Sequence, residues 1–348
     1  MFWRIALLSL VMLVTACAGP SQVPSPQATA TASPSRPVAT GAPSPTASAT
    51  ASPGSAPVPT HAPVATSVAT VVIAEPQLVP SFSHVFIIVM ENKETGSIVG
   101  NKSAPYINSL ASQYGQAANY YAIMHPSLPN YLALTGGRTF GVTTDCTNCF
   151  QSEQNIVDML EKGGKTWKAY MESMPQPCYL GADTSLYARR HNPFIYYDDV
   201  RNDPARCKNI VPLTQLETDL QNNAAPDYVW ISPNMCHAMH DCPVSSGDDW
   251  LRSWVQKIQA SSAWQDNSVL FLTFDEGTSN AGCCTYAAGG KITTIVISKL
   301  VKPGFVSQVE YNHYSLLRTI QESWRLYPLL GHAACECSAP MRDFFAPP

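Results

Sequence analysis

The chain has 348 residues and a formal net charge of −4, and only 13% of its residues are charged. Lysine and arginine form no run anywhere along the sequence. Because binding to a phosphate backbone needs a basic face, this composition argues against nucleic acid as the main partner.

The N-terminus reads as an export signal. A short basic start precedes an apolar run, and small residues lead up to Cys17. The run is too short to span a membrane. Its end matches a bacterial lipoprotein processing site, which predicts signal residues 1–17 and an exported protein anchored to the membrane through a lipidated Cys17. Ordinary cleavage that discards Cys17, with release outside the cell, is the alternative.

Residues 18–75 are dominated by Ala, Pro, Ser and Thr, and Arg36 is the only charged side chain among residues 18–70. Such a segment cannot bury enough apolar area to offset its chain entropy, so we expect a disordered spacer. Residues 76–348 are then left for one large α/β domain.

The domain contains ten cysteines besides Cys17. An even number in an exported protein predicts about five disulfides, whose pairing the sequence does not reveal. A zinc site is the alternative, suggested by the close spacing of several of them. The ten are Cys146, Cys149, Cys178, Cys207, Cys236, Cys242, Cys283, Cys284, Cys335 and Cys337.

Apolar runs of strand length alternate with helical patterns along the domain. Strands are expected at 84–90, 118–123, 166–171, 227–231, 268–274 and 292–297, with an edge strand at 71–75. Helices are expected at 104–114, 153–162, 248–261 and 314–324, and one more begins at 131–134. Residues 172–225 read as an irregular cap pinned by a disulfide. This alternation predicts a doubly wound, mostly parallel sheet with helices on both faces.

Several of these strands end in polar residues. The groups are Glu91-Asn92, His125 with Ser127, His237 with His240-Asp241, and Asp275-Glu276. In α/β sheets, ligands bind beyond the carboxyl ends of the strands, so these side chains are expected to meet at one edge.

Ser127 lies between two prolines in the stretch His-Pro-Ser-Leu-Pro-Asn-Tyr, just before a predicted helix. A serine on a stiff corner at a helix N-terminus faces unpaired backbone N–H groups, which suits an anionic substrate. We interpret Ser127 as a nucleophile for phosphorus; a proline-rich turn with a surface serine is the plain alternative.

Carboxylates together with an amide oxygen form a ligand set suited to Ca²⁺, Mg²⁺ or Mn²⁺. One such ion, or two, would lower the pKa of a neighbouring serine hydroxyl, while histidines protonate the leaving group. The sequence has no P-loop, no Gly-x-Ser-x-Gly elbow and no His-Glu-x-x-His.

Taken in order, these motifs resemble the bacterial phosphoesterase family within the alkaline phosphatase superfamily. That family includes secreted acid phosphatases, phosphatidylinositol 3-phosphatases and phospholipases C. The motifs run from about residue 83 to 326 and include Pro233-Asn234 and Asn312-His313.

The resemblance implies a role for each matching residue. Four would hold the metal: Glu91, Asn92, Asp275 and Glu276. Ser127 would form a phosphoenzyme. Residues that would contact phosphate or act as acid and base are His125, Asn130, His240 and His313, with Asp241 and Asp248 as weaker candidates. One departure is His237-Ala238, where the family pattern has Asn-Asp; His237 would take over part of that role.

The sequence thus predicts an exported, metal-dependent phosphomonoesterase that acts on phosphoinositides or other small phosphate esters. A phosphodiesterase or phospholipase C with the same site is the first alternative, because the shape of the cap decides whether a second ester group fits. A catalytically inert surface lipoprotein that binds ligands through residues 172–225 is the second.

Overall fold

The computed structural model describes residues 78–345 of the chain. The predicted export signal with Cys17, the spacer at 18–75 and the edge strand at 71–75 lie outside the described residues. Within the described range, no helix combines the length and apolar character needed to cross a bilayer.

The domain is built on one eight-stranded sheet in the order β4-β3-β5-β1-β6-β7-β2-β8. β7 runs antiparallel to both of its neighbours, and every other pair of adjacent strands is parallel. The strands are β1 (Val85–Met90), β2 (Gly115–Tyr121), β3 (Trp167–Met171), β4 (Ile210–Pro212), β5 (Tyr228–Ser232), β6 (Val269–Phe274), β7 (Lys291–Ile297) and β8 (Phe305–Asn312).

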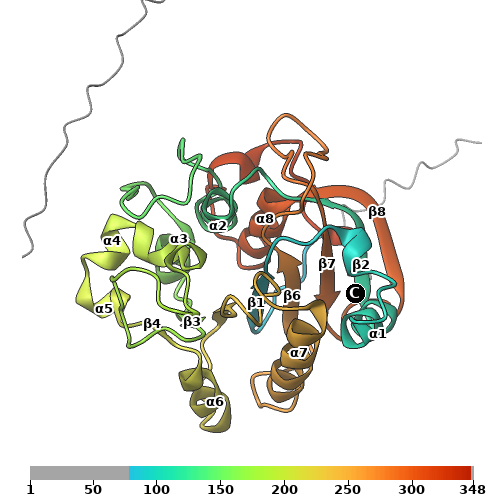
Figure 1. Ribbon diagram of the computed structural model, residues 1–348, viewed down its shortest axis with the longest axis horizontal. Helices are drawn as coiled ribbons and strands as arrows, with labels where there is room; N and C mark the ends of the chain where they lie inside the picture. Colours follow the sequence, from blue (N-terminus) through green and yellow to red (C-terminus); the bar gives the residue numbers. More distant parts are fainter. Residues whose placement is uncertain (1–77, 346–348) are drawn as a thin grey trace, which may run out of the picture. The chain divides into compact units, whose positions relative to one another are not determined.

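Helices cover both faces of this sheet (Figure 1). α2 packs on α8 on one side, and α1 packs on α7 on the other. The helices are α1 (Pro105–Gln113), α2 (Ser127–Gly136), α3 (Ile156–Lys162), α4 (Asp198–Arg201), α5 (Pro204–Cys207), α6 (Thr214–Gln221), α7 (Val244–Gln259) and α8 (His313–Ser323). Short 3₁₀ turns are η1 (Thr95–Ser97), η2 (Arg189–His191), η3 (Pro193–Tyr196), η4 (Gly331–Ala334) and η5 (Arg342–Phe344).

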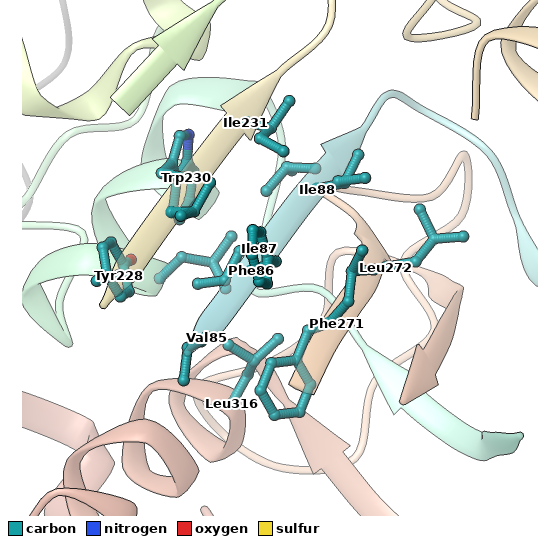
Figure 2. Packing of buried hydrophobic residues seen from close by; sticks show 14 of the residues in the cluster. Val85, Phe86, Ile87, Ile88, Tyr228, Trp230, Ile231, Phe271, Leu272 and Leu316 are labelled. Atoms are coloured by element: carbon teal, nitrogen blue, oxygen red, sulfur yellow. The ribbon is translucent and has the colours of Figure 1, made fainter. Parts of the chain in front are cut away.

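The core is centred on β1, which lies between β5 and β6 (Figure 2). All six residues of β1 and all six of β6 are buried, as expected for strands covered on both faces. Leu316 of α8 packs into the same cluster. Burial of apolar area contributes a free energy of about 25 cal/mol per Å² and so stabilises this central part of the sheet. It thereby holds the ends of β1 and β6 in place.

The predicted α/β class with a mostly parallel sheet is confirmed. Two parts of the prediction were incomplete. β8 was not predicted, because it is an edge strand with exposed and buried positions mixed along it. The cap at 172–225 is less irregular than expected: it contributes β4 to the edge of the sheet and carries α4, α5 and α6.

Three disulfides are formed in the described part of the chain, against about five expected. They are Cys146–Cys149, Cys178–Cys207 and Cys236–Cys242. Cys178–Cys207 lies within 172–225, so this segment is pinned by a disulfide as predicted. Cys283, Cys284, Cys335 and Cys337 carry free thiols.

A buried carboxylate ties the cap helix α6 to β3. Asp219 accepts hydrogen bonds from Lys168 Nζ and Tyr170 OH, both at 2.7 Å. Burial acts to raise the pKa of Asp219, but these hydrogen bonds outweigh it and hold the pKa below its ordinary value. The ionised carboxylate therefore stabilises the fold.

We expect Asp219→Asn to lower the free energy of unfolding by about 2–3 kcal/mol at neutral pH, because hydrogen bonds to a charged group are lost. A carboxyl group whose pKa is lower in the folded state stabilises the fold at pH values above its unfolded-state pKa of about 4. This stabilisation is lost as the pH falls through the folded-state pKa. The difference from wild type should therefore shrink below about pH 4 in urea unfolding curves. Asp249→Asn, at an exposed position of α7, is the control and should change little.

Candidate active site

Three acidic residues meet at the carboxyl ends of the two central strands. Glu91 follows β1, and Asp275 and Glu276 follow β6, whose last residue is paired with the last residue of β1. All three are buried. We refer to Glu91, Asp275 and Glu276 as the acidic cluster. The expectation that strand ends bring these residues together agrees with the structure.

Ser127 lies against the acidic cluster. Its Oγ donates to Glu91 Oε2 at 3.2 Å and reaches Glu276 Oε1 at 3.5 Å. The residue is the first of α2, after Pro126 in an extended conformation. The helix therefore starts at Ser127, four residues before the expected start. The hydroxyl is held at a helix N-terminus and is itself buried.

Asn92 completes the cluster. Its backbone is left-handed, with φ of 46°, and its N–H donates to Asp275 Oδ1 at 3.0 Å. One terminal atom of its amide lies 3.3, 3.3 and 3.1 Å from carboxylate oxygens of Glu276, Glu91 and Asp275. As nitrogen, that atom donates hydrogen bonds; as oxygen, it is a fourth acceptor that needs a cation between itself and the carboxylates.

The crowding of carboxylates changes their proton affinity. Burial, opposed by the hydrogen bond from Tyr131, raises the pKa of Glu91 to about 7. Burial and then the charge of Asp275 raise the pKa of Glu276 to about 8. Burial and then the charge of Glu91 raise the pKa of Asp275 well above its usual range. The protein alone therefore does not hold three ionised carboxylates here at neutral pH.

His125 connects the cluster to the surface. Its Nδ1 pairs with Glu276 Oε2, and its Nε2 lies 2.9 Å from the carbonyl oxygen of Ser279. About a third of its side chain (35%) is exposed. It is the one predicted histidine that both touches the acidic cluster through its side chain and reaches solvent.

Asn130 does not face a substrate, contrary to the prediction. Its Oδ1 accepts from the N–H groups of Ile123 and Met124 at 2.9 and 3.2 Å, and its Nδ2 donates to the carbonyl oxygens of Met124 and Pro126 at 2.6 and 3.1 Å. These bonds use the full hydrogen-bonding capacity of an amide. Asn130 therefore fixes the segment that carries His125 and Ser127.

His313 is also a positioning residue rather than an acid or base. It is fully buried, its Nε2 lies 2.5 Å from the carbonyl oxygen of Asp275, and its Nδ1 lies 3.3 Å from Tyr120 OH. Burial lowers its pKa to about 4. A neutral ring with both nitrogens engaged holds the end of β6 in place. Asp248 is structural too, because its carboxylate accepts from the N–H groups of Tyr106 and Ile107 at the start of α1.

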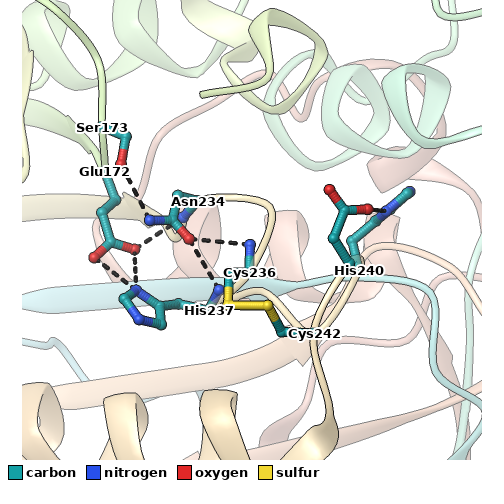
Figure 3. The surroundings of a disulfide bond; sticks show 8 residues. Glu172, Ser173, Asn234, Cys236, His237, His240 and Cys242 are labelled. Carbon is teal, nitrogen blue, oxygen red and sulfur yellow. Dashed lines mark hydrogen bonds and ion pairs between the residues drawn. A yellow bond between two sulfur atoms is a disulfide. The ribbon is translucent and has the colours of Figure 1, made fainter. Parts of the chain in front are cut away.

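The remaining predicted residues lie on a loop closed by Cys236–Cys242 (Figure 3). His237 Nδ1 lies 2.9 Å from Glu172 Oε1, and His240 Nδ1 lies 2.6 Å from Asp241 Oδ1. None of the three is hydrogen-bonded to the acidic cluster. The loop nevertheless contacts the site, because the Ala238 carbonyl accepts from the backbone N–H of Glu91 at 2.9 Å. The structure shows no contact through which His237 replaces the missing carboxylate.

Two residues beside Glu91 were not predicted. Tyr131 OH donates to Glu91 Oε1, and the ring of His191 stacks on Tyr131 at 5.2 Å. His191 Nε2 lies 3.2 Å from Glu91 Oε2 but is not aligned for a hydrogen bond, so this buried nitrogen has no partner. Burial, with the charge of Arg190 adding to it, lowers the pKa of His191 well below its usual range, so the ring is neutral.

Arg190 places a fixed positive charge that acts on Glu91. Its guanidinium lies 3.5 Å from Asp145 Oδ2 and 3.2 Å from Asp183 Oδ2. The other oxygen of Asp145 accepts from the N–H of Leu128, in the first turn of α2, at 2.9 Å. A carboxylate thus occupies the anion-binding end of the helix that carries Ser127, beside an arginine.

Sequence reasoning missed Tyr131 because it began the helix at residue 131. A helix that begins at Ser127 places residues 127 and 131, which are four apart, on the same face. No pattern pointed to Arg190 or His191, which lie on the 3₁₀ turn η2 within the cap. Among residues 78–345, no three His, Cys, Asp or Glu side chains stand as a ready-made set of metal ligands.

The chain is similar in sequence to known phosphatases. The chain is 31% identical over 266 residues to an acid phosphatase of Aspergillus fumigatus, covering 73% of this chain and 57% of the relative. It is 32% identical over 257 residues to a phosphatidylinositol-3-phosphatase of Mycobacterium tuberculosis, covering 73% and 80%. The lipoteichoic acid synthase LtaP of Listeria monocytogenes shares the fold, with a TM-score of 0.50 at 12% identity over 73% of this chain and 75% of that one.

The chain spans a little over half the length of the Aspergillus fumigatus relative. The family model for the Phosphoesterase family matches residues 98–327, which include Ser127, Asp275 and Glu276. The chain belongs to the Phosphoesterase family.

Proposed function

We propose that this protein is an exported, metal-dependent phosphomonoesterase of the acid phosphatase type, with phosphatidylinositol 3-phosphate among its substrates. The observation that carries the proposal is the placement of Ser127: its hydroxyl lies 3.2 Å from Glu91 and 3.5 Å from Glu276 at the start of a helix. The activities named for the relatives in Aspergillus and Mycobacterium support it. Export and the lipid anchor at Cys17 belong to the proposal.

The residues at the site fit a hard divalent cation. Three carboxylates, whose pKa values are all raised by burial and, for Asp275 and Glu276, also by a neighbouring carboxylate, gain from a positive charge among them. The amide atom of Asn92 that faces all three is a ligand when it is the oxygen, and the partnerless nitrogen of His191 points to Glu91. When bound, a Ca²⁺, Mg²⁺ or Mn²⁺ ion supplies the charge that lowers the pKa of the serine hydroxyl and offsets charge on phosphoryl oxygens.

The other steps of phosphate ester hydrolysis are carried out by side chains of the protein. Ser127 attacks phosphorus from a fixed position, and water then hydrolyses the phosphoserine. His125, which is open to solvent and paired with Glu276, protonates the leaving alkoxide and afterwards activates the water. Arg190 and the helix N-terminus receive phosphoryl oxygens in place of Asp145.

The direct test is a panel of matched monoesters and diesters with Ca²⁺, Mg²⁺ and Mn²⁺ supplied singly. We expect phosphate release from p-nitrophenyl phosphate and from phosphatidylinositol 3-phosphate, and loss of both after chelation. Cleavage of bis-p-nitrophenyl phosphate or release of phosphocholine, in preference to phosphate, would indicate a diesterase or phospholipase C. Inactivity on the whole panel would favour a surface-binding lipoprotein instead.

Replacement of His125 by glutamine should reveal its role through the leaving group. p-Nitrophenolate leaves without a proton, whereas the alkoxide of an aliphatic phosphate ester needs one. We therefore expect kcat/KM, which covers the steps up to departure of the alcohol, to fall about 10²-fold or more on an aliphatic monoester and much less on p-nitrophenyl phosphate. The matched control is His237→Gln, whose partner is Glu172. Equal losses on both substrates would show that His125 only positions Glu276.

A further inference from the structure

The four cysteines that carry free thiols within residues 78–345 lie together beside the candidate site. Cys283 Sγ and Cys284 Sγ are 3.6 Å apart, and Asn312 Nδ2 lies 3.8 Å from each of them. The same amide donates to the Cys337 carbonyl at 3.4 Å, and the Cys337 backbone N–H donates to Cys335 Sγ at 3.2 Å. We refer to Cys283, Cys284, Cys335 and Cys337 as the cysteine cluster.

The cluster joins two segments that are far apart in the sequence. Cys283 and Cys284 lie on the loop between β6 and β7, the loop that begins at Asp275-Glu276. Cys335 and Cys337 follow η4, after the last long helix. Between them is Asn312, which caps α8 with its side-chain oxygen. A covalent link here would fix the loop that leads out of the acidic cluster.

Four cysteines allow three pairings, and the backbone disfavours one of them. The peptide bond between Cys283 and Cys284 is trans, which places their Cα atoms about 3.8 Å apart. Disulfides need Cα atoms about 4.4–6.8 Å apart, so these neighbours cannot pair without distortion. Each must then pair with a cysteine of the other segment. Because the side chains of Cys337 and Cys284 interact, we pair these two, and the remaining pair is Cys283 with Cys335.

We propose that the cysteine cluster closes as two disulfides, Cys284–Cys337 and Cys283–Cys335, which cross-link the β6–β7 loop to the segment after α8. Each bond forms as two thiols give up two protons and two electrons to the disulfide of a thiol oxidoreductase of the export pathway, which is reduced to a dithiol. The proposal does not depend on phosphatase activity.

A tetrathiolate metal site is the main competitor. It needs four deprotonated thiols. Burial, together with the neighbouring thiols, raises the pKa of Cys283 and of Cys337 to about 12, which opposes that charge. Arg318 donates to the carbonyl oxygens of Cys335 and Ser338, and it has no hydrogen bond to a sulfur of the cluster.

The test uses the full chain, exported from cells through an oxidising compartment and alkylated under denaturing conditions before any reduction. Trypsin places Cys283 and Cys284 in peptide 258–291, and Cys335 and Cys337 in peptide 326–342. We expect no alkylation of these peptides and one species in which they are joined, which separates on reduction. Cys146–Cys149, inside peptide 139–162, is the internal control.

Paired variants determine the connectivity. C283S/C335S and C284S/C337S should each keep the two peptides joined and leave no alkylated thiol in them. C283S/C337S should leave Cys284 and Cys335, with a clear loss of cross-linked species. Four alkylated thiols in the wild-type protein, bridges confined within each peptide, or a stoichiometric zinc ion in the unreduced protein would each overturn the proposal.

Discussion

The Ser127→Ala variant is expected to release phosphate from p-nitrophenyl phosphate at least about a thousandfold more slowly than wild type. The reason is geometric: the hydroxyl is buried at the start of α2 and directed at Glu91 and Glu276, where a reacting phosphorus would be in reach. Alanine removes the nucleophile and tolerates the first turn of a helix, so the fold should survive. The measurement is kcat under saturating substrate, with circular dichroism to check the fold.

Two further variants separate nucleophile from scaffold. Ser127→Thr keeps a hydroxyl and should retain more activity than the alanine variant. Ser112→Ala, on the exposed side of α1, should be fully active. In acid-quenched wild-type enzyme, the tryptic peptide 103–138 should carry the mass of one additional phosphoryl group. An alanine variant within tenfold of wild type would show that Ser127 does not attack phosphorus.

The central strands were predictable because their buried residues are consecutive in the sequence. β1 and β6 are unbroken runs of six buried residues, and few other structures explain such runs of strand length. β8 is different, since half of its residues are exposed and it is held by pairing with β2 alone. Its existence depends on a partner strand far away in the sequence, which local pattern does not encode.

The start of α2 was placed too late for an identifiable reason. Prolines at 126 and 129 suggested a stiff corner that would delay the helix until residue 131. Proline is tolerated in the first turn, however, because the N–H groups there have no helical partner. The helix therefore begins at Ser127, and this earlier start places Ser127 and Tyr131 on one face, both touching Glu91.

The sequence predicted which residues lie near the site, but it did not show what each side chain contacts. It brought Glu91, Asp275 and Ser127 together, because strand ends determine position. It could not distinguish an amide that faces a substrate from one that faces the backbone, as Asn130 does. Nor could it show that His313 is buried behind the end of β6, since burial of a single polar side chain is a property of the packed fold.

The second large effect is expected from Asp275→Asn, which should abolish activity and yet stabilise the metal-free protein. Asparagine keeps the shape of the side chain but removes one of three crowded carboxyl groups. We expect binding of Ca²⁺, Mg²⁺ or Mn²⁺ to weaken by more than about 100-fold, which removes the rise in Tm that each ion gives to wild type. Thermal unfolding with and without each ion measures both effects.

The stability gain has a definite pH dependence. The Asp275 carboxyl titrates near pH 4 in the unfolded chain, whereas burial and then Glu91 raise its pKa well above that value in the metal-free fold. Below about pH 4 the group is protonated in both states and has no effect. As the pH rises toward the folded-state pKa, the unfolded chain gains from ionisation and wild-type stability falls. Asparagine does not ionise, so the variant should become more stable than wild type as the pH rises from about 4 toward neutrality.

Asp266→Asn is the matched control. Asp266 is exposed and pairs with Lys299, so its replacement should leave activity and the response to divalent ions unchanged. If Asp275→Asn instead destabilises the chelated protein at neutral pH while activity persists, the three carboxylates are a structural hydrogen-bonded cluster. The ion that Ser127 needs would then have to bind elsewhere, and the assignment of this sheet edge as a catalytic metal site would be wrong.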